Sequence, residues 1–216
     1  MHRHLGYVVL LLVTLEPCAN ALADAPPPRL PFDAVTWDAT LKAAPSLGMK
    51  MGSFYVRLEK TTLDDVRRAA SVGDILHQGD AGESVYWLCY TNVTSGATER
   101  IWIMAHGEMG GPDHSVTNIT AQLLPTRKAT ADCPALPQKL KPLSLDHNIW
   151  LQTPLSDVVK KLGVPSYEKG SWRSFDYRGK VPGNCEGEGF DFMSSLFLKL
   201  NSARVTSLYL DQGTTC

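Results

Sequence analysis

The sequence lacks the marks of several broad classes of protein. Its formal net charge is −1, so it has no basic excess of the kind that nucleic-acid-binding domains carry. Its longest apolar run, from Leu5 to Leu15, is too short to span a bilayer, and no other stretch approaches that length. We therefore expect neither a nucleic-acid-binding protein nor a protein that stays inserted in a membrane.

Common catalytic motifs are also missing. The sequence contains no G-x-S-x-G nucleophile elbow, no H-E-x-x-H zinc motif and no Gly-rich phosphate loop. Beyond Ala25, its histidines are His77, His106, His114 and His147, and none lies in a recognisable triad context. No cysteine lies in a C-x-x-C or similar reactive setting. We expect a protein that is not an enzyme and holds no cofactor; the alternative is a hydrolase with an unrecognised site.

Residues 1–25 have the layout of a secretory signal peptide. The basic start "MHRH" precedes the apolar run, and "ANALADA" offers small-residue cleavage sites after Ala21, Ala23 or Ala25. Cys18, in "LEPC", does not fit a lipid-attachment site, because Glu and Pro stand where such sites have small residues. The sequence therefore predicts an exported protein, located in the periplasm or the medium.

One stretch of the chain occurs twice. "TTLDDVRRAASVGD", from Thr61 to Asp74, and "TPLSDVVKKLGVPS", from Thr153 to Ser166, match at a constant offset that pairs Leu63 with Leu155. Repetition at such a spacing is typical of two copies of one folding unit.

Each copy is expected to begin with a short helix and to continue as a β-meander. Apolar residues at i, i+3, i+4 and i+7 predict an amphipathic helix that opens at Thr153 or Pro154 and stops at Gly163, and the first copy repeats this pattern more weakly. Alternating stretches that follow predict strands; they are "SVYWLCY", "RIWIMAH" and "VTNITAQL", then "SWRSFDY", "SLFLKL" and "VTSLYL". The expected class is α+β, with two tandem repeats, each a helical segment packed on an antiparallel meander.

Prolines set the expected boundaries of these units. "APPPRLP", residues 25–31, predicts a stiff, extended lead-in. Four prolines within residues 125–142 cannot lie inside a helix or a central strand, so this stretch is expected to be a linker. The expected organisation is a signal peptide at 1–25, an N-terminal extension at 26–53, a first repeat at 54–124, a Pro-rich linker at 125–144 and a second repeat at 145–216.

Four cysteines remain after signal-peptide removal, namely Cys89, Cys133, Cys185 and Cys216. An even number in an exported chain predicts two disulfides, for which three pairings exist. If each repeat closes its own bridge, the pairs are Cys89–Cys133 and Cys185–Cys216, which link the end of each meander to an earlier strand.

The order of a short amphipathic helix, "LGVPS", an aromatic strand ending in Tyr and two further strands resembles the SmpA/OmlA lipoproteins of outer-membrane assembly. Two copies in one exported, disulfide-containing chain resemble the β-lactamase inhibitory protein family, which is built from tandem units of this kind. The resemblance covers roughly residues 54–216. It implies a non-enzymatic protein-binding module, such as an inhibitor of a secreted or periplasmic enzyme, with another exported or envelope protein as its partner. The alternative is an envelope-assembly factor of the SmpA/OmlA type.

Aromatic residues on one face of the predicted strands are the main candidates for partner binding. If Ile101 and Ile103 face the helix, their neighbours in the strand face away from it. Large exposed aromatic and Met patches usually mark protein contact surfaces. The alternative is that a second layer, such as residues 32–54, covers this face. The candidates are Trp102, Met104, Phe197 and Tyr209.

The stretch "HGEMGGPDHS", residues 106–115, forms a longer loop than its counterpart in the second copy. We expect it to be a solvated or partner-contacting loop, with Glu108 and Asp113 among the contact residues. The alternative is a zinc-like site formed by His106, Glu108, Asp113 and His114, since these are suitable ligands for a divalent ion. Their spacing matches no metal-binding signature, so no metal is expected.

Overall fold

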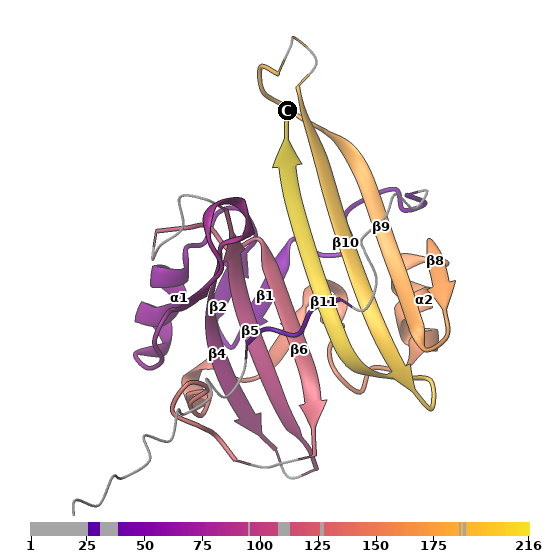
Figure 1. Ribbon diagram of the computed structural model, residues 1–216. Helices are drawn as coiled ribbons and strands as arrows, with labels where there is room; N and C mark the ends of the chain where they lie inside the picture. The colour runs from indigo at the N-terminus through magenta and orange to yellow at the C-terminus, as the bar shows by residue number, and fades with distance from the viewer. Residues whose placement is uncertain are drawn as a thin grey trace, which may run out of the picture.

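The computed structural model describes residues 26–30, 39–94, 96–107, 113–125, 128–185, 187 and 189–216 (Figure 1). The predicted signal peptide and Glu108 lie outside these residues. The elements in chain order are β1 (Gly48–Met51), β2 (Phe54–Arg57), α1 (Leu63–Ala70), β3 (Leu76–Gln78), η1 (Ala81–Glu83), β4 (Val85–Val93), β5 (Thr98–His106), β6 (Asn118–Leu124), η2 (Gln138–Leu140), β7 (Leu143–Leu145), η3 (Asp146–Asn148), α2 (Leu155–Leu162), β8 (Tyr167–Lys169), β9 (Trp172–Val181), β10 (Phe190–Asn201) and β11 (Arg204–Thr215).

Most strands belong to one antiparallel sheet of eight, in the order β3-β4-β5-β6-β11-β10-β9-β8. The last strands of the two copies, β6 and β11, pair at its centre, where Gln122 lies opposite Ser207 and Asn118 lies opposite Asp211. The two copies therefore share a single continuous sheet. A smaller sheet has the order β2-β1-β7.

The expected α+β class is wrong. The described residues form eleven strands in two antiparallel sheets and two α-helices of eight residues each, so the protein is mostly β. Helices do occur at both predicted positions, but the meanders are not separate units that each carry one helix. Strands β1 and β7 come from stretches that we expected to be an extension and a linker. With three or four residues each, these strands are too short for an alternating pattern to be read.

The helices begin and end where local chemistry dictates. The Thr62 hydroxyl accepts a hydrogen bond from the Asp65 backbone N–H at 3.1 Å, and the Asp65 carboxylate accepts one from the Thr62 N–H at 3.0 Å. This capping box satisfies two backbone donors that a helix start otherwise leaves free. Helix α2 follows Pro154 and ends at Gly163, whose φ of 96° suits glycine.

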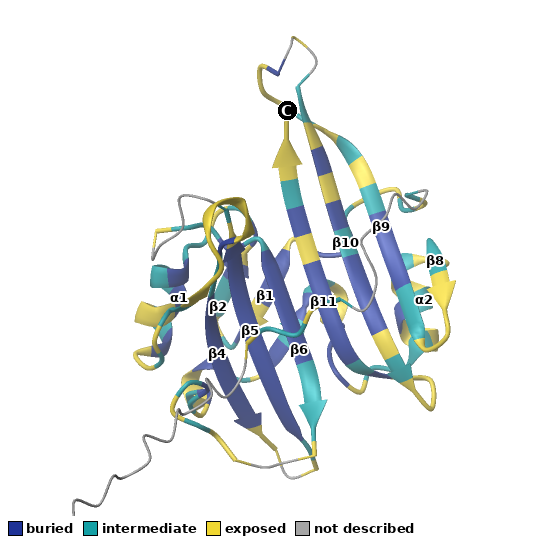
Figure 2. Ribbon diagram, viewed as in Figure 1, coloured by how far each residue is buried: buried dark blue, intermediate teal, exposed yellow. Residues whose placement is uncertain are grey.

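The main core lies between the large sheet and the layer behind it. Side chains of Ile101, Ile103 and Leu196 are fully buried there, together with residues of α1, α2 and the small sheet. Figure 2 shows the buried residues running along β4 and β5. Each fully buried aliphatic side chain of this kind contributes about 1.5–3 kcal/mol to stability.

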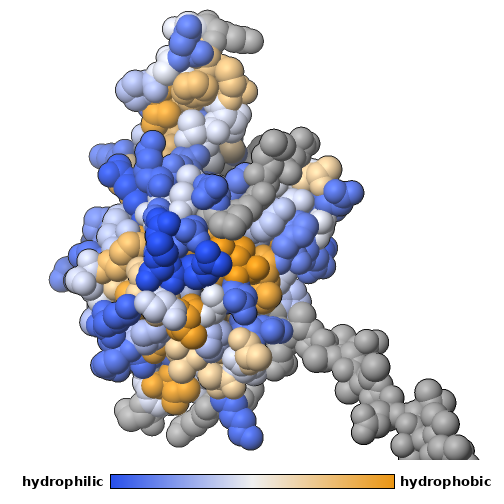
Figure 3. All heavy atoms as spheres, turned by 90° about the vertical axis from the view of Figure 1, so that its left-hand side faces the viewer, coloured by the Kyte–Doolittle hydropathy of each residue, from blue (hydrophilic) through white to orange (hydrophobic). Residues whose placement is uncertain are grey.

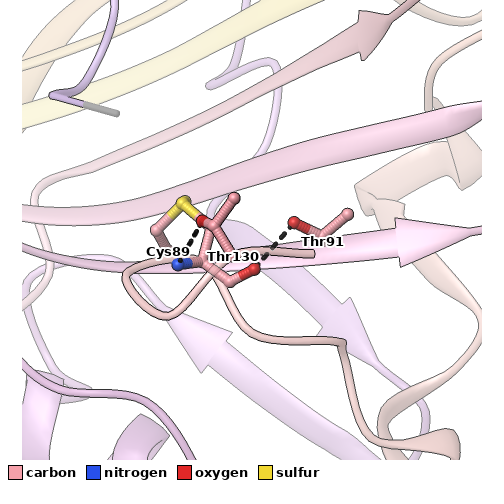
Figure 4. Close-up of a disulfide and its surroundings, with 4 residues drawn as sticks. Cys89, Thr91 and Thr130 are labelled. Atoms are coloured by element: carbon pink, nitrogen blue, oxygen red, sulfur yellow. Dashed lines mark hydrogen bonds between the residues drawn. A yellow bond between two sulfur atoms is a disulfide. The ribbon is translucent and has the colours of Figure 1, made fainter. Parts of the chain in front are cut away.

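Both disulfides are present and confirm the pairing expected from the repeat. Cys89 pairs with Cys133, with 4.6 Å between their Cα atoms, and Cys185 pairs with Cys216 at 5.4 Å. Around Cys133 the chain runs along β4, since the Thr91 hydroxyl donates to the Cys133 carbonyl at 2.9 Å and the Cys133 N–H donates to the Thr130 hydroxyl at 3.2 Å (Figure 4). Two disulfides are compatible with an exported protein. No helix among the described residues is long and apolar enough to cross a membrane.

Candidate binding groove on the front face

The four aromatic and Met candidates share one face of the large sheet, opposite the helices and the small sheet. We call this the front face; it faces the viewer in Figure 1. The expected exposure of these side chains is wrong, because their relative exposures are only 2–4%. Whether they contact a partner stays a prediction. They are Trp102, Met104, Phe197 and Tyr209.

The first disulfide explains the burial of the two candidates on β5. Trp102 and Met104 pack with Trp87, Cys89 and Cys133 in a second, smaller core. The stretch that carries Cys133 therefore forms the covering layer on this part of the front face. The alternative that a second layer covers this face is therefore correct here, but residues 32–54 do not provide the layer: β1 lies in the small sheet on the other side, and residues 31–38 lie outside the described residues.

The two candidates in the second half pack against neighbouring strands. The ring of Tyr209 lies 5.7 Å from that of Trp172, and its hydroxyl accepts a hydrogen bond from the Gln122 amide at 2.9 Å. The Lys199 ammonium group lies 5.9 Å from the Trp172 ring. Burial raises the pKa of Tyr209 above its usual value. These contacts hold the aromatic rings in place along the front face.

A groove crosses the front face where the two halves of the sheet meet. Its volume is about 800 Å³. Met104 from β5, Thr120 from β6 and Tyr209 from β11 form its floor, and the segment Pro26–Leu30 forms one wall. Figure 1 shows this indigo segment crossing in front of β5 and β6 towards β11. We call this site the front-face groove.

Polar side chains from three strands converge in the front-face groove. The Asp211 carboxylate accepts a hydrogen bond from the side-chain amide N–H of Asn118 at 3.4 Å, and the Thr120 hydroxyl donates to the side-chain Oδ1 atom of Asn118 at 3.1 Å. His106 lies beside them, with its Nδ1 atom 3.1 Å from the Thr117 hydroxyl. The groove thus combines an apolar floor with a carboxylate, an amide and an imidazole.

Loss of hydration in the groove shifts the pKa values of His106 and Asp211, as it does that of Tyr209. Both His106 and Asp211 present exposed surface, yet the protein around them removes part of their hydration. Desolvation raises the pKa of Asp211, and nearby Glu59 raises it further, against the opposing effects of Asn118 and His106. Desolvation lowers the pKa of His106, against the attraction of Asp211. Loss of hydration in the groove therefore disfavours the charged form of Asp211.

The structure separates the residues of the 106–115 loop. His106 faces the groove, whereas the ring of His114 lies 6.3 Å from that of Tyr86, which packs against the main core on the opposite face. Asp113 is exposed, and Glu108 lies outside the described residues. Among the residues that are described, no group of three or more His, Cys, Asp or Glu side chains could hold a metal ion. Partner contact by Glu108 and Asp113 stays a prediction.

Sequence reasoning missed Asp211, Asn118 and Thr120 as members of the site. The signal for Asp211 was present, because it follows Tyr209 by two residues in a strand and therefore shares its face. Asn118 and Thr120 required the pairing of β6 with β11, which no local pattern announces.

Other surfaces are less well formed. A second hollow of about 550 Å³ lies beside the end of α2, between residues 40–44 and 161–165, where Val164 is 73% exposed. Figure 3 shows the side of the molecule that carries α1, where hydrophilic residues predominate and apolar areas are small and separate. We therefore take the front-face groove as the candidate functional site.

No family model, curated protein or solved structure matches this chain, so its resemblance to the β-lactamase inhibitory protein and SmpA/OmlA families stays a prediction.

Proposed function

We propose that the protein is an exported, non-enzymatic protein-binding module whose front-face groove holds another exported or envelope protein. An enzyme that the module inhibits would be such a partner. An envelope-assembly role would use the same surface.

The observation that carries this proposal is the composition of the groove at the junction of the two halves. Ligand sites are typically concave, apolar at the floor and supplied with a few convergent polar groups. Met104 and Tyr209 provide the floor, while His106, Asn118 and Asp211 provide the polar groups. Aromatic and Met side chains of this kind are enriched in protein interfaces. Because β5, β6 and β11 all contribute, the groove needs both halves of the sheet.

A hydrolase is the second candidate, and one observation favours it. The His106 imidazole lies 3.1 Å from the Thr117 hydroxyl through its Nδ1 atom and is affected by the charge of Asp211, so the three kinds of group found in hydroxyl-imidazole-carboxylate triads are present. However, Thr117 also accepts a hydrogen bond from the His106 backbone N–H at 3.3 Å, as expected of a residue that closes a turn. We therefore place binding first.

The test is affinity capture from the exported fraction of the source cells, using residues 26–216 as bait. Asp211→Lys replaces the carboxylate of Asp211 in the groove with an ammonium group, and Asp74→Lys makes the same replacement at an exposed position after α1. We expect wild type and Asp74→Lys to retain one partner that Asp211→Lys loses. A partner that all three retain would place the contact elsewhere. Turnover in a hydrolase panel that His106→Ala and Thr117→Val both abolish would replace binding with catalysis.

A further inference from the structure

The front-face groove already contains a piece of peptide, which is the chain's own segment Pro26–Leu30. This segment lies with no helix or strand structure across β5, β6 and β11, where it lines the groove together with Met104, Thr120 and Tyr209 (Figure 1). The groove thus accommodates an extended chain that runs across the strands.

The composition of the segment determines how it is held. Pro26, Pro27 and Pro28 have no backbone N–H, so most of the segment cannot pair with a strand. Their rings hold the backbone extended before binding, which lowers the entropic cost of docking. Proline-rich segments of other proteins dock in grooves lined by aromatic side chains for this reason. Tyr209, supported by Trp172, provides such a surface.

The charges of the groove favour a basic segment. Two carboxylates line it, Asp211 from β11 and Glu83 from η1. Arg29, which is exposed, lines the same groove. A guanidinium group pairs well with carboxylates, so a basic residue in the segment suits this lining.

We propose that the front-face groove is a binding site for an extended, proline-rich segment with a basic residue, presented by a partner protein, and that Pro26–Leu30 occupies this site in the isolated chain. The inference rests on the proposed function and specifies the chemistry of the partner. A tethered segment competes at high effective concentration, so a partner must displace it. The apparent affinity of the partner equals its affinity for the free groove multiplied by the fraction of molecules in which the groove is free.

A fluorescent peptide with the sequence of residues 25–31, APPPRLP, tests the proposal by fluorescence anisotropy with residues 26–216. In the variant Pro27→Ser/Pro28→Ser/Arg29→Glu the tethered competitor is weakened. We expect this variant to bind the peptide about tenfold more tightly than wild type does. Arg29→Ala changes one exposed side chain and serves as a second, milder variant, for which we expect a smaller gain in the same direction.

Two controls identify the groove and the charge. Adding Asp211→Lys to the triple variant is expected to weaken peptide binding about tenfold or more, whereas adding Asp74→Lys leaves it unchanged. The peptide APPPELP, in which Glu replaces Arg, is expected to bind at least about tenfold more weakly than APPPRLP. Equal binding by wild type, Arg29→Ala and the triple variant would overturn the proposal. So would binding that Asp211→Lys leaves intact, or a wild-type dimer in solution that the triple variant abolishes, which would assign the groove to a second copy.

The partner capture described above separates this proposal from the proposed function. If capture depends on Asp211 but no variant binds APPPRLP, the groove binds a protein of other chemistry, and only the present proposal is wrong. If the peptide binds as expected and no partner is captured, the peptide site stands and the proposed function loses its support.

Discussion

The carboxylate of Glu59 accepts hydrogen bonds from the backbone N–H of Thr214 at 2.7 Å and from its hydroxyl group at 2.8 Å. Glu59 precedes α1 in the first half of the chain, while Thr214 lies near the end of β11, beyond Asp211, where pairing with β6 stops. The same carboxylate accepts a third bond, from the Gln212 amide at 3.0 Å. Glu59 therefore joins the two halves outside their shared sheet.

Glu59→Ala should lower the free energy of unfolding by about 1–3 kcal/mol, because three donors on β11 lose a charged acceptor. Urea denaturation of oxidised protein measures this loss. Asp74→Ala, which removes an exposed carboxylate, is the matched control and should change stability by less than about 0.5 kcal/mol. Equal stability of the two variants would mean that the Glu59 contacts make no net contribution.

Trp102→Ala should destabilise the protein by about 3–5 kcal/mol, because it leaves a cavity in the small core beneath the Cys89–Cys133 disulfide. Val164→Ala, at a position that is 73% exposed, should have little effect. Denaturation curves for the two variants provide the comparison. A Trp102→Ala protein that keeps wild-type stability and loses its partner would instead restore Trp102 as an exposed contact residue.

The two disulfides should be reduced in a fixed order. Cys89 and Cys133 are 0–1% exposed, whereas Cys216 is exposed at the end of the chain. Thiol exchange requires access to a sulfur atom, so limited dithiothreitol should open Cys185–Cys216 first. Peptide mapping after alkylation measures the order. Simultaneous reduction of both disulfides would contradict the expected order. When the Cys89–Cys133 disulfide is reduced in turn, the free energy of unfolding should fall by about 4 kcal/mol on the chain-entropy model.

Asp211→Asn should stabilise the protein at neutral pH. Folding raises the pKa of Asp211 above its usual value of 3.8. At pH values above 3.8, the folded protein therefore holds a proton on Asp211 more readily than the unfolded chain does. Stability therefore falls as pH rises from that value through the raised pKa, and Asn removes this loss. His106 acts in the opposite direction, because its lowered pKa makes stability rise as pH increases towards 6.5.

Thermal unfolding of wild type, Asp211→Asn and His106→Gln between pH 4 and pH 8 measures these contributions. Asp211→Asn should gain stability and lose peptide binding, as expected of a residue whose unfavourable environment serves recognition. An Asn variant with lower stability at pH 7 would show that the carboxylate contributes favourably to folding.

Particular residues show how far the sequence could predict this structure. Thr62 and Asp65 mark the start of α1 through bonds that they make locally, and the alternation of Trp102 with Ile103 assigns opposite faces of β5 correctly. The disulfide pairing followed from the repeat. These features depend on neighbours in the sequence or on the internal similarity of the chain.

Other features depend on distant contacts. Alternation shows that Trp102 and Tyr209 share a face but not that Cys133, or Pro26–Leu30, lies over it. Likewise, β6 and β11 each carry a pattern that suits any neighbouring strand, so their pairing depends on the whole fold. The front-face groove exists only once this pairing places Asn118 beside Asp211.

The pairing of β6 with β11 also determines which strand edges of the large sheet stay open. Long edge strands with free backbone groups promote aggregation, and this arrangement places two strands of only three residues, β3 and β8, at the ends of the sheet. On the outer edge of β4, beyond its pairing with β3, the Thr91 N–H donates to the Pro134 carbonyl and the Thr91 carbonyl accepts from the Leu136 N–H. On the outer edge of β9, the Asp176 carbonyl accepts a hydrogen bond from the Leu41 N–H. The pairing of residues 118–122 with residues 207–211 thus removes the facing edges of β6 and β11 from the surface, which leaves other chains less free backbone to which they could add a strand.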